Sequence, residues 1–462
     1  MPNIASHNGI DVGNIASING VDLPSSGGAF DALADTGTYT EESGAGTGMF
    51  LYGGVPADLG VGNDGHGSGY IKGPAMNFSS DKDGIFPHRK QPSNFSNRNW
   101  TKFECSKELF AGIDTDGKLW MSGEATNRVH QASNASTLTQ ATSVTNVSDD
   151  TAWTDVSVGH DYCLAINAGY LYVIGEAGDG QLGHGSSSDK STLFRVGSSN
   201  DWYKVAAGQD HSIAIRGASG SRSLWSTGEN TNGKCGSGDT SGDDLSWIER
   251  ISADSGEDWT FVSCSRENSL AIKAGKVFMC GDGGNQLPMG NTSSSDVTTF
   301  TQTGKIDSGG TFGTNWTSGQ IFTGEASLLI NSSGELWHAG EGGAGSRGDG
   351  STSDNKAGYH VKVSGSGAAG GSDNWTLISR IEPSSSSDDT YAGICNGQLF
   401  TWGSFSGSSP SNGRPQLGHA SQSTGTLSTA TAVANTNTCS YVSASEASSE
   451  TARFVLASFT IS

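Results

Sequence analysis

The chain has 462 residues, of which 68 are glycine and 33% are hydrophobic, and its formal net charge at pH 7 is −21. This acidity excludes a phosphate-tracking role, because nucleic-acid binding rests on lysine and arginine side chains that release counterions. No stretch approaches the ~18 apolar residues of a membrane span, and the N-terminus lacks the features of a signal peptide, so we expect a soluble protein made in a cytoplasm, without nucleic acid or membrane insertion.

An N-terminal arm covers residues 1–48 and begins with a tandem 11-residue repeat, NIASHNGIDVG from Asn3 and NIASINGVDLP from Asn14. Asn-Gly flanked by apolar residues is the strongest short-range signal for a hairpin, so each copy predicts one. The arm contains no lysine or arginine and too little apolar surface for a core of its own. We therefore expect it to become ordered against a partner chain.

The tandem copies resemble the N-terminal attachment arms of structural proteins from tailed bacteriophages. This resemblance implies a location in the virion, after assembly in the host cytoplasm, with other virion proteins bound through residues 1–48. The expected anchoring residues are the apolar side chains of the two copies, namely Ile4, Ile10, Ile15, Ile18 and Val21.

The second expected domain, residues 49–462, opens with a short strand at Met49–Tyr52 and a long connection from about Gly60 to Asn99. Aromatic and basic side chains gathered in one loop have the composition of an interface hot spot. The candidate partner-binding residues in this connection are Phe86, His88, Arg89, Lys90 and Phe95. The alternative is that the connection only packs over one face of the domain.

Six copies of a longer repeat follow, and each begins with a tryptophan. These tryptophans are Trp100, Trp153, Trp202, Trp259, Trp316 and Trp375. Their spacing of about 50 to 60 residues is in the range of propeller blades rather than of helical solenoids. Short apolar runs such as Cys163–Ile166 and Leu171–Ile174 flank a glycine-containing turn, which predicts antiparallel strands joined by hairpins.

A further copy is split between the chain ends. Strands are expected around Tyr441 and at Phe454–Leu456, and Met49–Tyr52 supplies the strand that the C-terminal part lacks. Pairing of these ends would remove exposed sheet edges. We therefore expect an all-β, seven-bladed β-propeller closed by pairing of its N- and C-terminal strands, with residues 49–54 and 439–462 forming the last blade and a short extended N-terminal arm.

The longer repeat resembles the regulator of chromosome condensation repeat. The residues that match its segments are Gly208, His211, Ser212 and Ala214; Gly334, Leu336 and Trp337; Gly397, Leu399, Trp402 and Gly403; Gln181, Leu182, Gly183 and Gly185; and Gln416, Leu417 and Gly418. The resemblance implies the propeller fold. Family members that act as nucleotide exchange factors for a small GTPase also bind chromatin, and this acidic chain departs from that pattern, so the activity is not carried over.

Several short motifs favour structural roles. The GxGxxG patterns that start at Gly178 and Gly343 occupy the turn position of the repeat, and the third, at Gly365, also precedes no helical pattern, so turn glycines are expected instead of a dinucleotide site. The adhesion tripeptide that starts at Arg347 is expected to be coincidental. The Asn-Trp-Thr segments at Asn99, Asn315 and Asn374 match the N-glycosylation acceptor motif, but they recur with the repeat and are expected to be structural.

Neither metal binding nor catalysis has a complete motif. His160 and His211 lie near equivalent points of two copies and are expected to be structural, since no zinc-site spacing surrounds them. The segments that start at Asp81 and Asp114 resemble fragments of a calcium loop without its remaining ligands. No nucleophile elbow, Walker loop or catalytic carboxylate pair occurs. We expect a non-enzymatic protein with no cofactor, no metal site and no catalytic residue.

Two function hypotheses remain open. The first is a virion structural protein, such as a tail fibre, appendage or decoration, whose propeller binds a host cell-surface protein or glycan. The second is a soluble protein-interaction or inhibitor propeller. A guanine nucleotide exchange factor is a distant alternative that rests on the family resemblance alone.

Overall fold

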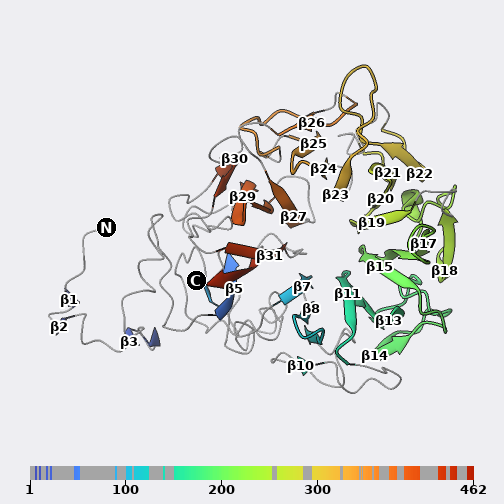
Figure 1. Cartoon of the computed structure of the whole chain (residues 1–462), viewed down its shortest axis with the longest axis horizontal. Helices are drawn as coiled ribbons and strands as arrows, with labels where there is room; N and C mark the ends of the chain where they lie inside the picture. Colours follow the sequence, from blue (N-terminus) through green and yellow to red (C-terminus); the bar gives the residue numbers. More distant parts are fainter. Residues whose placement is uncertain are drawn as a thin grey trace.

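The computed structural model consists of four-stranded antiparallel sheets arranged around a central axis (Figure 1). The residues it describes are 6–7, 10–11, 17–18, 21–22, 46–52, 89–90, 100–106, 109–123, 139–140, 150–251, 258–284, 294–322, 326–342, 345, 347–355, 358–363, 374–381, 390–405, 425–432, 438–444 and 455–461. These residues include one 3-10 turn, η5 (Thr231–Gly233), and no α-helix. No helix among them could cross a membrane.

The N-terminal arm contains the two hairpins that its tandem repeat predicts. Strand β1 (Ser6–His7) pairs with β2 (Ile10–Asp11), and β3 (Ser17–Ile18) pairs with β4 (Val21–Asp22), both antiparallel. The hairpin prediction is therefore confirmed for both copies.

Six blades follow in chain order, and within each blade the strands are consecutive in the sequence. Blade 1 contains β7 (Trp100–Cys105), β8 (Leu109–Asp114), β9 (Leu119–Gly123) and β10 (Thr139–Gln140). Blade 2 contains β11 (Trp153–Val158), β12 (Tyr162–Asn167), β13 (Tyr170–Gly175) and β14 (Lys190–Arg195). Blade 3 contains β15 (Trp202–Ala207), β16 (His211–Arg216), β17 (Ser223–Gly228) and β18 (Asp244–Ile251).

The other three blades repeat this order. Blade 4 contains β19 (Trp259–Cys264), β20 (Asn268–Lys273), β21 (Lys276–Gly281) and β22 (Val297–Thr303). Blade 5 contains β23 (Trp316–Ile321), β24 (Ala326–Asn331), β25 (Leu336–Gly340) and β26 (Val361–Lys362). Blade 6 contains β27 (Trp375–Ile381), β28 (Thr390–Cys395), β29 (Gln398–Phe405) and β30 (Gly425–Ala432). The first strand of every blade lies nearest the axis (Figure 1).

The chain ends form a sheet of different make-up, in the order β31 (Thr438–Ala444), β32 (Val455–Ile461), β5 (Gly46–Tyr52) and β6 (Arg89–Lys90). Leu456 pairs with Leu51 and Val455 with Tyr52, so the two ends meet as expected. Strand β31 contacts both β7 and β27, which puts this sheet between the first and sixth blades (Figure 1).

The expectation of seven blades is corrected to an all-β propeller of six blades. Each of the six begins with a buried tryptophan, and together they have described inter-blade cores. The chain-end sheet has no tryptophan in its strands, and its side chains lie outside the described residues except at Cys439. Its backbone pairing joins the chain ends, but it lacks the leading tryptophan with which each of the six blades begins.

A β-bulge follows the tryptophan that begins each of the six copies. In all six blades the pairing register between the first and second strands shifts directly after the tryptophan. In five of these blades the next residue is a threonine whose hydroxyl donates to a carbonyl of the second strand, as Thr317 does to Ile330 O (3.2 Å) and Thr376 to Ile394 O (3.4 Å). The threonine of the Asn-Trp-Thr segments therefore has a structural role, because it satisfies a carbonyl at the bulge.

The hydrophobic core lies between neighbouring blades. All six residues of β12, β20 and β24 are buried, since a strand in the middle of a blade is covered on both faces. The leading tryptophan packs edge-on against an aromatic ring of the third strand, as in Trp153–Tyr172 and Trp259–Phe278, both with ring centroids 5.3 Å apart. Because the aromatic rings fill the space between sheets, short strands suffice for a stable ring.

In blades 2 and 3, the turn that follows the third strand contacts the next blade. We call it the inter-blade turn; it covers residues 176–185 in blade 2 and residues 229–238 in blade 3. The amide of Gly185 donates to Leu245 O on β18 (2.7 Å), and the amide of Gly238 donates to Thr298 O on β22 (2.8 Å). These bonds cover part of the outer edge strand of the following blade. The pattern that starts at Gly178 therefore lies in a turn, as expected, whereas the one that starts at Gly365 lies outside the described residues.

Candidate functional site

The structure describes two of the five residues expected to bind a partner. Arg89 and Lys90 form β6, whose backbone pairs with Leu51 and Phe50 in the chain-end sheet. The other three, Phe86, His88 and Phe95, lie outside the described residues. Of the anchoring residues, the arm's hairpins contain Ile10, Ile18 and Val21, whereas Ile4 and Ile15 lie outside the described part.

Two other sequence motifs have internal partners. The Arg347 guanidinium pairs with Asp349 (2.7 Å), and a Cβ at Gly348 would lie only 3.1 Å from the Trp402 ring, so the tripeptide is part of a packed turn. The Asp114 carboxylate accepts hydrogen bonds from the amides of Asp116 and Lys118, both at 3.0 Å. Asp114 thus stabilises the hairpin turn.

The two histidines lie near equivalent points of their blades, as expected, but not at the same point. Tyr162 pairs with Gly175 as His211 pairs with Gly228, so His160 lies two positions earlier in its blade. His211 is fully buried and its Nε2 is 2.9 Å from the Ser269 hydroxyl. Burial holds its pKa well below the usual value, so the ring is neutral and structural.

The ring has two faces with different loops. One face carries the loops that connect the first strand of each blade to the second, together with the end of the third strand, and we call it the acidic face. The opposite face carries the hairpin loops that connect the second strand to the third, and we call it the hairpin face. The acidic face places two carboxylate-bearing residues side by side in each of blades 2, 3 and 4. Their backbones are joined by amide-to-carbonyl bonds, from Glu176 to Asp161 (3.0 Å), from Glu229 to Asp210 (2.9 Å) and from Asp282 to Glu267 (3.0 Å).

Asp210 has the most perturbed carboxyl group of this face. Burial raises its pKa to about 6, Asp179 and Glu229 act in the same direction, and Lys234 and His160 act against it. Burial also raises the pKa of Asp179, with further contributions from Glu229 and Asp243. Half-buried carboxylates that repel one another are stabilised by an added cation, and such perturbed groups gather at functional sites.

Lys234 is the buried cation of the same region. Its side chain is fully buried, and its Nζ lies 2.6 Å from Glu229 and 2.9 Å from Glu267, so it joins blades 3 and 4. Burial lowers the pKa of Lys234, but the bonds and charges of the two glutamates outweigh burial and raise it. The Lys234 ammonium group therefore forms ion pairs with both glutamates, and the pKa values of Asp210 and Asp179 stay raised although Lys234 is nearby.

Three described acids of the hairpin face have cationic partners. Arg216 contacts Asp201 (2.6 Å), Arg222 contacts Asp258 (2.9 Å), and Lys362 contacts Glu335 (2.7 Å). The charges of these three acids are therefore compensated within the protein. The raised pKa values of Asp210 and Asp179 make the acidic face the stronger candidate for binding a basic partner.

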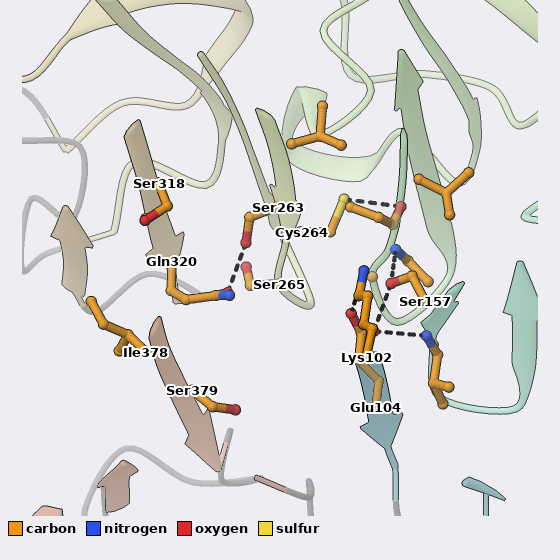
Figure 2. A pocket seen from close by; sticks show the side chains of 18 of the residues that line it. Lys102, Glu104, Ser157, Ser263, Cys264, Ser265, Ser318, Gln320, Ile378 and Ser379 are labelled. Atoms are coloured by element: carbon orange, nitrogen blue, oxygen red, sulfur yellow. Dashed lines mark hydrogen bonds and ion pairs between the residues drawn. The ribbon is translucent and has the colours of Figure 1, made fainter. Parts of the chain in front are cut away.

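A cavity of about 300 Å³ lies at the centre of the ring, and Figure 2 shows its walls. On the side of blades 1 to 3, Lys102 contacts Asp155 (2.8 Å) and Glu104 (3.2 Å). Glu104 also accepts from the Val158 amide (2.9 Å), and Asp155 from the Val205 amide (2.9 Å). This charged wall ties neighbouring inner strands together and satisfies amides at their free edges.

Sequence reasoning missed the acidic-face residues. The available signal was the acid that follows the closing glycine of most copies, such as Glu176, Glu229 and Asp282. That signal shows recurrence, but it does not show that Asp210 from another loop lies beside it. Repetition alone also gave no reason to separate paired acids from unpaired ones.

Comparisons with known proteins agree with the repeat and the ring. The model of the regulator of chromosome condensation (RCC1) repeat matches residues 168–215, which run from β13 to the next-to-last residue of β16 and include the inter-blade turn of blade 2. Human WBSCR16 is 16% identical over 90% of this chain and 99% of its own, with a TM-score of 0.64. The fold is an RCC1-type β-propeller.

Two yeast structures resemble this RCC1-type propeller to a similar degree. Prp20p of Saccharomyces cerevisiae, described with its binding to Gsp1p and histones, is 14% identical over 91% of this chain and 93% of its own, with a TM-score of 0.60. Yeast RCC1 (Prp20) bound to Kap60 is 14% identical over 91% of this chain and 90% of its own, with a TM-score of 0.59. Identities this low establish the fold and not a shared activity.

Proposed function

We propose that this protein is a non-enzymatic protein-interaction propeller that binds a basic segment of a partner through its acidic face. The observation that supports the proposal is the half-buried Asp210, whose pKa of about 6 reflects burial together with the nearby carboxylates Asp179 and Glu229. A lysine or arginine of a partner would relieve this repulsion. Propellers of the same fold whose descriptions name protein partners support the general class.

Asp210→Asn tests the proposal by binding of an oligolysine peptide, measured by isothermal titration calorimetry. We expect association to weaken about fivefold, equivalent to about 1 kcal/mol, because one attractive carboxylate is lost. Binding to the native protein should also weaken as the pH falls through 6, since Asp210 is ionised above its pKa and protonated below it. The variant should show a smaller change over that range.

Asp116→Asn is the matched control, because Asp116 is exposed in a turn of the hairpin face. The control should change association less than about twofold. Equal weakening by both variants would mean that the peptide senses only the net charge of −21, and the acidic-face proposal would be rejected.

A second candidate function is a structural component of a virion, located in the particle and binding a host cell-surface protein or glycan. The paired strands β1–β2 and β3–β4 favour it, since a tandem of small hairpins suits an attachment arm. Removal of residues 1–24 should leave the thermal midpoint of the propeller unchanged and prevent incorporation into particles. Incorporation of the shortened chain at the normal level would contradict this function.

A further inference from the structure

The central cavity has a second wall that the charged residues do not reach. It is formed by the inner strands of blades 4 to 6, β19, β23 and β27, and its side chains form two layers. The layer two residues after each tryptophan contains Phe261, Ser318 and Leu377, and the layer four residues after it contains Ser263, Gln320 and Ser379. The first layer is largely apolar and the second is polar and uncharged.

Two groups of this wall are available to a ligand. Gln320 Oε1 accepts a hydrogen bond from the Ser263 hydroxyl (2.7 Å), which orients the amide across the wall (Figure 2). Among the described residues, neither Gln320 Nε2 nor the Ser318 hydroxyl has a hydrogen-bond partner. The wall therefore offers an amide donor and a hydroxyl beside the half-buried Phe261 ring.

The opposite wall of the cavity, which contains Lys102, Glu104 and Asp155, does not favour a charged ligand. Lys102 is held between Glu104 and Asp155, and both carboxylates also accept backbone amides. An anion would have to compete with two carboxylates for Lys102, and a cation would meet the ammonium group itself. A neutral ligand avoids both costs.

The size and chemistry of the cavity together indicate a small, neutral, hydroxylated molecule. A volume of about 300 Å³ is at the lower end of ligand pockets. A sugar ring presents hydroxyl groups at its edge and C–H groups on its face, which match the polar layer and the aromatic ring of this wall. We propose that the channel binds a neutral monosaccharide against Ser318, Gln320 and Phe261. This site does not depend on the acidic-face proposal.

The full chain is titrated with glucose, galactose and N-acetylglucosamine, with glucuronate as the charged comparison, and binding is followed by saturation-transfer NMR. We expect at least one neutral sugar to bind and glucuronate to bind at least about tenfold more weakly. Gln320→Leu should weaken the neutral sugar about tenfold, because a buried hydrogen bond is lost. Ser318→Ala should weaken it in the same direction.

Ser191→Ala is the control, since Ser191 is exposed on β14, the outermost strand of blade 2. It should leave binding unchanged. Gln320→Leu also removes the acceptor of Ser263, whereas Ser318→Ala leaves that bond intact, so the second variant distinguishes lost contact from a disturbed wall. Failure of all three neutral sugars to bind, or native affinity in both variants, would overturn the proposal, as would glucuronate binding as tightly as a neutral sugar.

Discussion

At the scale of single residues, one buried lysine shows how a repeat tolerates a departure from its pattern. Lys234 occupies the position in the inter-blade turn of blade 3 that Gln181 occupies in blade 2, and both side chains are fully buried. A buried ammonium group is costly unless its charge is matched. Here Glu229 from its own blade and Glu267 from blade 4 lie within 2.9 Å, so the substitution is compensated by two acids.

Lys234→Met should destabilise the protein by about 3 kcal/mol, because it leaves two partly buried carboxylates without their cation. The free energy of unfolding is measured by urea denaturation. Lys362→Met makes the same change in a surface pair, where Lys362 is 42% and Glu335 30% exposed, and it should cost less than about 1 kcal/mol. Similar losses in the two variants would show that the buried pair contributes no more than a surface one.

At the scale of elements, glycines determine how closely the inter-blade turn approaches the next blade. Gly183 has φ of +61°, and a Cβ there would lie 2.4 Å from the Trp247 ring of blade 3. The Thr227 hydroxyl lies 2.9 Å from Gly180 O of the same turn and 2.6 Å from Asp244 O at the start of β18. Tight approach, more than chain reversal, therefore requires glycine at this point.

Gly183→Ala should lower the thermal midpoint more than Gly197→Ala. Gly197 has nearly the same φ, +60°, but no atom lies within 4 Å of its Cβ position. The backbone cost of about 1–2 kcal/mol is common to both, whereas the clash at Gly183 adds about 1–3 kcal/mol. Calorimetric unfolding of the two variants measures the difference, and equal midpoints would show that Trp247 moves aside without cost.

At the scale of the whole molecule, charge is distributed unequally between the two faces and the channel. Three acids of the hairpin face have cationic partners, those of the channel tie inner strands together, and those of the acidic face include carboxyls with raised pKa values. The net charge of −21 is therefore distributed unevenly over the molecule. This uneven distribution favours attraction of a basic partner to the acidic face and orients its approach.

Much of the architecture follows from the sequence by itself. The tryptophan repeat, the apolar runs and the glycine turns are local patterns, so they predicted the propeller class, the Asn-Gly hairpins of the arm and the pairing of Leu456 with the strand that contains Leu51. Strand periodicity and turn chemistry act over a few residues, and a single sequence displays both.

Only the tertiary structure decided which side chains meet. The partners of Lys234 and the wall around Gln320 depend on contacts between blades that are about 50 residues apart in the chain. Asp210 and Asp179 are ordinary acids in the sequence, and their pKa values are raised because ring closure buries them beside other carboxylates. Burial and charge are properties of the assembled ring, and no local pattern encodes them.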